Sequence, residues 1–262
     1  AWCAFLKKHG FLVGLSIDGP SAYHDANRLD DTRKGTFRRV LEGKQRLDHF
    51  GIEYNVLMTL TKTLARHPQQ VWRFMEEQDL HFVQMTPCMG PMNQAETPYA
   101  LTPERYASFY IALFDLWYQS YQKGTYRSVK LFDDLVNLLA VGQCNACGLV
   151  GSCQTQIVVE ADGGVYPCDF YVLDEWRVGN LCQESLRQVW DQAQKSGFLT
   201  REREPLALCE QCPYRSMCGG GCRRMRREVY YAPGAAACGH RIFLDAVIDR
   251  LRQLAALHQR RP

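Results

Sequence analysis

The sequence predicts an α/β fold with a parallel sheet, followed by a cysteine-rich region and a C-terminal helix. Three apolar runs, at residues 11–17, 52–60 and 80–86, alternate with helix-like segments at 36–50 and 68–78. Nearly continuous apolar runs are typical of strands that are buried on both faces of a parallel sheet. Strands that alternate with helices across short links indicate βαβ units.

The segments around these strands complete the first half of the chain. Residues 1–9 are helix-like, residues 18–34 form a polar loop, and residues 103–122 and 128–141 predict two longer helices. The aromatic residues of the helix at 103–122 recur at helical spacing, which predicts a buried face. They are Tyr106, Phe109, Tyr110, Phe114 and Trp117.

The composition changes at residue 142. Ten of the twelve cysteines lie between residues 144 and 238, among many glycines and few regular elements. The exceptions are a hairpin at 157–166, a helix at 184–196 and an amphipathic C-terminal helix at 241–258. We therefore expect two domains, formed by residues 1–141 and 142–262.

Charge and hydropathy limit the partners and the compartment. The net charge of +3 indicates no polyanionic partner such as nucleic acid, and no apolar run reaches the length of a membrane span. Lys7, Lys8 and His9 interrupt the first apolar run, so no signal peptide is expected. We therefore expect a cytoplasmic location. Because disulfides are rare in the cytoplasm, metal or cluster ligation explains the many cysteines better than disulfide bonds do.

The spacing of the cysteines indicates ligand sites. Residues 209–222 read CxxCx5CxxxC with Cys238 further on, and residues 153–168 read Cx9Gx4C. Glycines 219–221 separate the last two sulfurs of the run, and glycine lets the backbone approach bulky inorganic groups. Iron–sulfur clusters, or zinc sites with four thiolates each, could use the same residues.

Together with this spacing, two further stretches resemble the anaerobic sulfatase-maturating enzymes, which are radical S-adenosylmethionine enzymes with a SPASM domain. One is YPCDFYVLD at residues 166–174, and the other is GLSIDGP at 14–20 with His24, Asp25 and Arg28 after it. The resemblance covers nearly the whole chain. It implies that residues 1–141 are the latter strands of a (βα)6 radical-SAM barrel. It also implies that residues 142–262 are a SPASM auxiliary-cluster domain with a C-terminal helix.

The resemblance implies two auxiliary [4Fe–4S] clusters. The first cysteine set would be Cys147, Cys153, Cys168 and Cys222, and the second would be Cys209, Cys212, Cys218 and Cys238. Cys222 would thus serve a different cluster from its sequence neighbours, as in two-cluster ferredoxins. Cys144 could be a substitute ligand, and Cys182 is expected to be a buried small residue.

The resemblance also implies an activity, the oxidation of a Cys or Ser of a sulfatase to Cα-formylglycine. Asp169 would take the proton from the target side chain, as a better base than a surface carboxylate provided that it is buried beside a negative cluster. Ser16, Asp18 and Arg28 would contact S-adenosylmethionine at the carboxyl end of a strand. The implied partners are the sulfatase polypeptide and a reductant such as flavodoxin or ferredoxin.

The sequence departs from the family in one respect, since CxxxCxxC, the motif for the radical cluster, is absent. We therefore expect an N-terminally truncated polypeptide. S-adenosylmethionine and a third [4Fe–4S] cluster would then be used only in a full-length form.

Other interpretations stay open at this point. Asp169 could cap a turn, and Ser16, Asp18 and Arg28 could be ordinary strand-end and loop residues. The chain could be another SPASM peptide-modifying enzyme or a non-catalytic iron–sulfur remnant. A zinc-binding nucleic-acid module could use the arginines at 223–227, which are more simply counter-charge for clusters.

Overall fold

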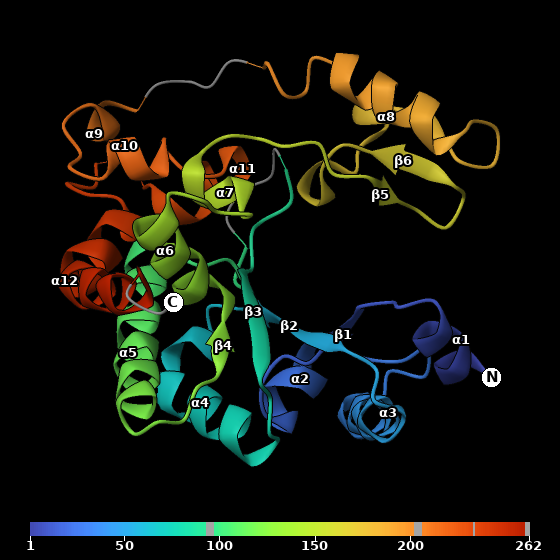
Figure 1. Ribbon diagram of the computed structural model, residues 1–262, viewed down its shortest axis with the longest axis horizontal. Helices are drawn as coiled ribbons and strands as arrows, with labels where there is room; N and C mark the ends of the chain where they lie inside the picture. The colour runs from blue at the N-terminus through green and yellow to red at the C-terminus, as the bar shows by residue number, and fades with distance from the viewer. Residues whose placement is uncertain (93–96, 202–205, 233, 260–262) are drawn as a thin grey trace. The chain divides into compact units, whose positions relative to one another are not determined.

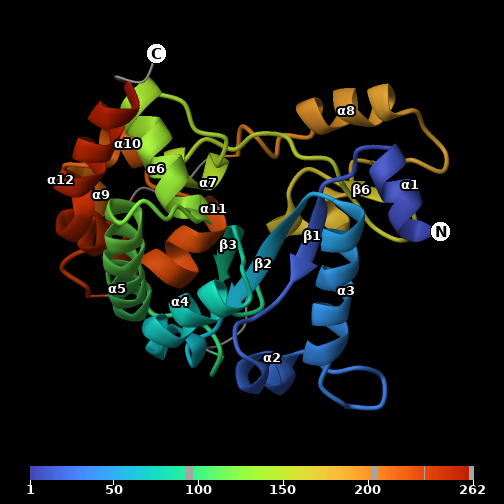
Figure 2. The ribbon, with the colours of Figure 1, turned by 60° about the horizontal axis from the view of Figure 1, so that its bottom comes forward.

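A four-stranded parallel sheet organises the first part of the chain in the computed structural model, which describes residues 1–92, 97–201, 206–232 and 234–259. The strands lie in the order β1 (Val13–Ser16), β2 (Tyr54–Leu60), β3 (Phe82–Pro87) and β4 (Ser128–Val129). Figure 2 shows β1, β2 and β3 side by side with α3 next to them. The α/β fold with a parallel sheet is confirmed.

The sheet has one buried face and one open face. In β2, Val56, Met58 and Leu60 are buried, whereas Leu57 between them is exposed. Because side chains alternate along a strand, one face packs against helices and the other remains accessible. The helices of this part are α1 (Trp2–Lys8), α2 (Ser21–Asn27), α3 (Phe37–Phe50), the 3₁₀ turn η1 (Leu64–Arg66), α4 (Pro68–Glu77), α5 (Pro103–Gln122) and α6 (Lys130–Val141).

Helix α5 supplies the aromatic core. Its five predicted core residues, Tyr106 to Trp117, are all buried, which confirms the predicted buried face. Thr102 caps the helix by accepting a hydrogen bond from the Arg105 N–H, and Pro103 takes the first helical position, where no donor is needed. The Tyr110 hydroxyl donates to the Met85 carbonyl over 3.0 Å, which ties α5 to β3.

The C-terminal helix α12 (Gly239–Gln259) packs beside α5 and α6 (Figure 1). Its Phe243, Val247 and Leu251 are fully buried. Contacts therefore divide the chain into one unit of residues 1–145 and 227–262 and a second unit of 146–226. This division starts near the predicted boundary at 142 but differs from the prediction at the C-terminus, because the apolar face of α12 is buried in the first unit.

The second unit contains a small antiparallel sheet and several short helices. The sheet is β5 (Val158–Val159), β6 (Gly164–Tyr166) and β7 (Gly179–Asn180). The helices are α7 (Cys147–Val150), α8 (Leu186–Lys195), α9 (Ala207–Glu210), α10 (Arg215–Cys218) and α11 (Arg223–Met225), with 3₁₀ turns η2 (Asp169–Tyr171) and η3 (Asp174–Trp176). A π-helical turn (Arg226–Tyr230) follows α11, and all of it except Arg226 belongs to the first unit. Among the described residues, no helix has the length and apolarity needed to cross a bilayer.

Candidate functional site

The structure brings Asp18 and Arg28 together at the carboxyl edge of the sheet. Asp18 follows the end of β1 and is 5% exposed. Arg28 Nε donates to Asp18 Oδ2 over 2.6 Å, and the Thr59 N–H donates to Asp18 Oδ1 over 2.6 Å. Ser16 is the last residue of β1 and is half-buried at the same edge. Asp18 thus joins β1 to β2 and to the loop that carries Arg28.

His24 stabilises the Asp18–Arg28 pair through hydrogen bonds with Asp18 and Thr36. Its Nδ1 accepts the Asp18 N–H over 3.2 Å, so its Nε2 is the ring donor and lies 3.1 Å from the Thr36 hydroxyl oxygen. The Thr36 hydroxyl in turn donates to the Arg28 carbonyl over 3.0 Å. Burial lowers the pKa of His24, which favours the neutral ring that this pattern requires. His24 therefore has a structural role.

Replacing Asp18 with alanine tests the strength of this junction. The change leaves the Arg28 guanidinium and the Thr59 N–H without their carboxylate partner, which we expect to lower the free energy of unfolding by about 3 kcal/mol. Denaturant titration followed by tryptophan fluorescence measures the effect. Asp31→Ala, at an exposed position nearby, is the control and is expected to cost less than about 0.5 kcal/mol. Equal stability of both variants would mean that Asp18 has no structural role.

A thiol also belongs to this edge. Cys88 follows the end of β3 and is half-buried. Burial raises its pKa, and the nearby Asp18 carboxylate adds to the effect. Since the carboxyl ends of parallel strands are where α/β proteins bind ligands, Cys88 and Thr59 join Ser16, Asp18 and Arg28 as candidate lining residues.

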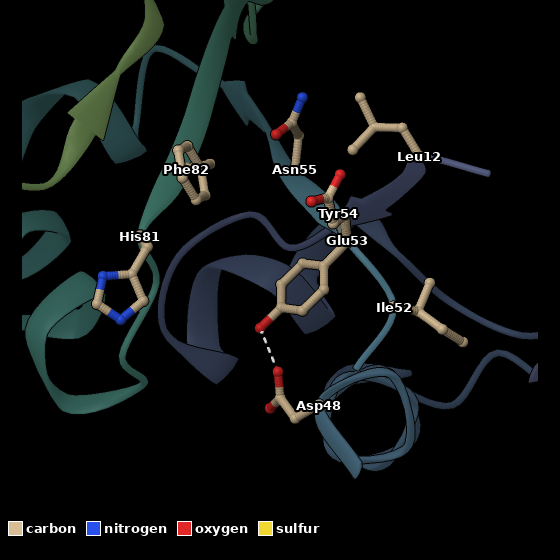
Figure 3. A pocket seen from close by; sticks show the side chains of 8 residues that line it. All are labelled: Leu12, Asp48, Ile52, Glu53, Tyr54, Asn55, His81 and Phe82. Atoms are coloured by element: carbon tan, nitrogen blue, oxygen red, sulfur yellow. Dashed lines mark hydrogen bonds between the residues drawn. The ribbon is translucent and has the colours of Figure 1, made fainter. Parts of the chain in front are cut away.

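A pocket of about 360 Å³ lies at the opposite edge of the sheet (Figure 3). It is lined by residues at the start of the strands, among them Leu12, Tyr54 and Phe82. The Tyr54 hydroxyl donates to Asp48 over 2.8 Å across one side of it. This is the amino-terminal edge, which in parallel α/β sheets is the edge away from the active site. The pocket is therefore a weaker candidate than the carboxyl edge.

The second unit gathers the first cysteine set. Cys147 starts α7, Cys168 follows β6, and Cys222 is the N-cap residue of α11. The pKa of Cys222 is raised by burial and then by the neighbouring Cys147 and Cys153, and that of Cys168 is raised to about 12 by burial, with Asp169 and Cys222 adding to it. The sulfurs of Cys147, Cys153 and Cys168 thus lie within electrostatic reach of the Cys222 sulfur. All four are thiols and not cystines.

Backbone N–H groups point at these sulfurs. Cys222 accepts from the N–H groups of Met225 and Arg224 at the start of α11, and Cys168 accepts from that of Phe170. Such hydrogen bonds lower a thiol pKa against the effect of burial, because they stabilise the thiolate. Thiolate is the form that binds iron or zinc.

Glycines let the backbone close around the first set. A Cβ at Gly148 would lie 3.1 Å from Cys222 Cβ, and one at Gly151 would lie 2.5 Å from the Gly219 carbonyl oxygen. Gly151 also has φ +65°, a conformation that favours glycine. Four thiols, N–H donors and a tight glycine backbone fit an iron–sulfur cluster. Among the described residues, no three His, Cys, Asp or Glu side chains converge on a single-ion site.

The second cysteine set is divided between the two units. Cys209 lies in α9, Cys212 follows it, and Cys218 ends α10. Cys238 belongs to the first unit, where its Sγ accepts the Arg241 N–H over 3.3 Å at the start of α12. The assignment of these four residues to one cluster stays a prediction.

Asp169 lies beside the first cysteine set but is exposed. Its Oδ1 accepts from Cys168 Sγ over 3.6 Å, and its N–H donates to Gln156 Oε1 over 3.5 Å. The burial on which its stronger basicity was predicted to depend is therefore missing. Its carboxylate instead stays accessible to a substrate while its backbone is held by Gln156.

The remaining two cysteines of the cysteine-rich region differ from each other. Cys182 was predicted to be buried, and this prediction is wrong, because its side chain is exposed in the turn after β7. Its N–H donates to Asn180 Oδ1 over 2.7 Å, which fixes the turn with the thiol outside. Cys144 is half-buried at the end of the first unit, and its predicted role as a substitute ligand stays open.

Comparison with known proteins identifies the lineage of both units. The SPASM family, described as an iron–sulfur cluster-binding domain, matches residues 147–213. The chain is 37% identical over 228 residues to a cysteine-type anaerobic sulfatase-maturating enzyme of Clostridium perfringens (strain 13 / Type A), covering 86% of this chain and 62% of that protein. It is 26% identical over 242 residues to a serine-type enzyme of Bacteroides thetaiotaomicron, covering 86% of this chain and 58% of that protein.

A solved structure agrees along nearly the whole chain. Native anSMEcpe with bound AdoMet and Cp18Cys peptide superposes with a TM-score of 0.85 at 33% identity, covering 98% of this chain and 73% of that chain. The chain spans about 60% of the length of the curated relatives that it matches. These relatives do not favour another SPASM enzyme, an iron–sulfur remnant or a zinc nucleic-acid module. The chain belongs to the family of anaerobic sulfatase-maturating enzymes.

Proposed function

We propose that this chain carries the substrate-oxidising and electron-transfer part of a formylglycine-generating enzyme. Its substrate would be a sulfatase polypeptide, in which one Cys or Ser becomes Cα-formylglycine. The observation that carries the proposal is the first cysteine set, gathered around Cys222 with Asp169 beside it. The similarity to cysteine-type and serine-type maturating enzymes supports the same function.

Cysteine is the better supported target. Identity to the cysteine-type enzyme is 37%, against 26% for the serine-type enzyme. The reaction removes a hydrogen atom from the target Cβ, a proton from its sulfur and one electron. The resulting thioaldehyde reacts with water to give the aldehyde and hydrogen sulfide.

The residues of the chain divide this work. Asp169 takes the proton from the target thiol, because its exposed carboxylate is accessible to the substrate. The first and second cysteine sets each hold a [4Fe–4S] cluster, and Ser16, Asp18 and Arg28 border the place of S-adenosylmethionine. When bound, S-adenosylmethionine and the clusters supply the radical and electron chemistry. A flavodoxin or ferredoxin would be the reductant, and the location would be cytoplasmic.

Peptide oxidation tests this function. The sequence holds no CxxxCxxC motif. The chain is therefore fused to the N-terminal part of the Clostridium perfringens relative that lies outside the matched region, where the family resemblance implies the motif. The anaerobic fusion receives S-adenosylmethionine, dithionite and a sulfatase peptide with the target cysteine. We expect an aldehyde product by mass spectrometry and no product without S-adenosylmethionine. A cluster-loaded fusion that binds the peptide without forming aldehyde would contradict the proposal.

A further inference from the structure

Arg223 follows Cys222 directly and clamps a distant segment of the second unit. Its Nη1 donates to the Phe198 carbonyl over 3.1 Å, and its Nη2 donates to the Arg201 carbonyl over 3.0 Å. Its guanidinium carbon also lies 5.3 Å from the centre of the Phe198 ring. A planar guanidinium can make these contacts at once, whereas a lysine ammonium cannot.

Phe198 links Arg223 to the segment that carries Cys168, another member of the first cysteine set. This ring is 1% exposed and packs edge-on against Tyr171, with centroids 5.3 Å apart. Tyr171 ends the turn that Asp169 begins, immediately after Cys168. Arg223 and Phe198 therefore brace Cys222 against the segment that carries Cys168 and Asp169.

The same guanidinium places a positive charge near the sulfurs. The pKa of Tyr171 is raised by burial and by the Cys222 thiolate, and it is lowered by Arg223, Arg201 and Arg224. The Tyr171 hydroxyl therefore lies near both Cys222 and Arg223. Arg223 Nε is buried and has no hydrogen-bond partner within the described residues. A buried donor of this kind needs a partner, and an anionic cluster sulfur is of the right chemistry.

We propose that Arg223 is a positioning residue of the first cluster site, which holds Cys222 in place through Phe198 and raises the reduction potential of the bound cluster. The inference rests on the cluster-binding part of the proposed function. A cluster gains negative charge when it is reduced, so a fixed cation nearby favours the reduced state.

Two substitutions at Arg223 separate the clamp from the charge. Arg223→Met removes both, whereas Arg223→Lys keeps the positive charge but loses the planar guanidinium that donates to two carbonyls. Arg187→Met is the control, because Arg187 is exposed on α8 and pairs only with Asp191 in the described contacts. The anaerobically reconstituted 262-residue protein is titrated with dithionite under EPR, and iron release to a chelator is timed.

We expect both Arg223 variants to release iron about tenfold faster than wild type, as is usual for lost outer-sphere contacts. Only Arg223→Met should lower the potential of one cluster, and Arg187→Met should match wild type in both measurements. If Arg223→Met takes up no cluster, the lysine variant still tests the inference, which predicts faster iron release than in wild type and the wild-type potential. Arg223 variants that match Arg187→Met, or a lysine variant whose potential falls as far as that of methionine, would overturn the inference. Wild-type protein without any cluster would instead contradict the proposed function itself.

Discussion

Replacing Asp169 with asparagine is expected to slow peptide oxidation by about 10²- to 10⁴-fold while both clusters remain bound. Asparagine has nearly the same shape as aspartate, but it cannot take a proton from the target thiol. Losses of this size are typical when a general base is removed. The measurement is the initial rate of aldehyde formation by the fusion protein, together with its iron content.

The control for Asp169 is Asp174→Asn, since Asp174 is exposed at the start of the neighbouring turn η3. This variant is expected to oxidise the peptide at the wild-type rate. An Asp169→Asn enzyme with full iron content and unchanged rate would show that another group accepts the proton. Loss of iron from Asp169→Asn would show that the residue supports the cluster site and would leave its role as a base without support.

Replacing Cys222 with alanine is expected to remove about four of about eight irons per chain and to loosen the second unit. Cys222 lies near Cys147, Cys153 and Cys168, which come far before it in the sequence. Metal binding stabilises folded structure, so loss of one ligand should expose α7 and the η2 turn. Iron and sulfide analysis gives the stoichiometry, and hydrogen exchange reports the opening.

Cys182→Ala is the matched control, because Cys182 is exposed and lies outside both cysteine sets. It is expected to keep the full iron content and the wild-type exchange pattern. A Cys222→Ala protein that also keeps all its iron would remove Cys222 from the ligands. A protein that loses all its iron would mean that the two cysteine sets do not bind independently.

Long apolar runs allowed the strands and the long helices to be predicted from the sequence. The predicted strand at 52–60 is β2 (Tyr54–Leu60), and the predicted helix at 103–122 coincides with α5. Helix α2 (Ser21–Asn27) was taken as a loop, since its sequence is polar and its place depends on the buried His24. Strand β4 has only two residues and was read as part of the following helix.

The spacing of the cysteines predicted ligand sites, whereas the division of the cysteines into two sets came from the family resemblance. The residues of the first cysteine set lie in one unit, near Cys222, and their assignment to one cluster stays a prediction. The pairing of Asp18 with Thr59 joins residues 41 positions apart, and no local pattern reports such a contact. The exposure of Asp169 and the clamp of Arg223 on Phe198 likewise depend on tertiary packing.

Mössbauer spectroscopy of the wild-type 262-residue protein, reconstituted anaerobically with ⁵⁷Fe and sulfide, is the most direct test of the claim that eight cysteines hold two clusters. The expected result is about eight irons per chain, all in [4Fe–4S] form, from a protein that contains no zinc. A chain that binds zinc in place of iron, or holds about four irons when fully loaded, would contradict the assignment of the two cysteine sets.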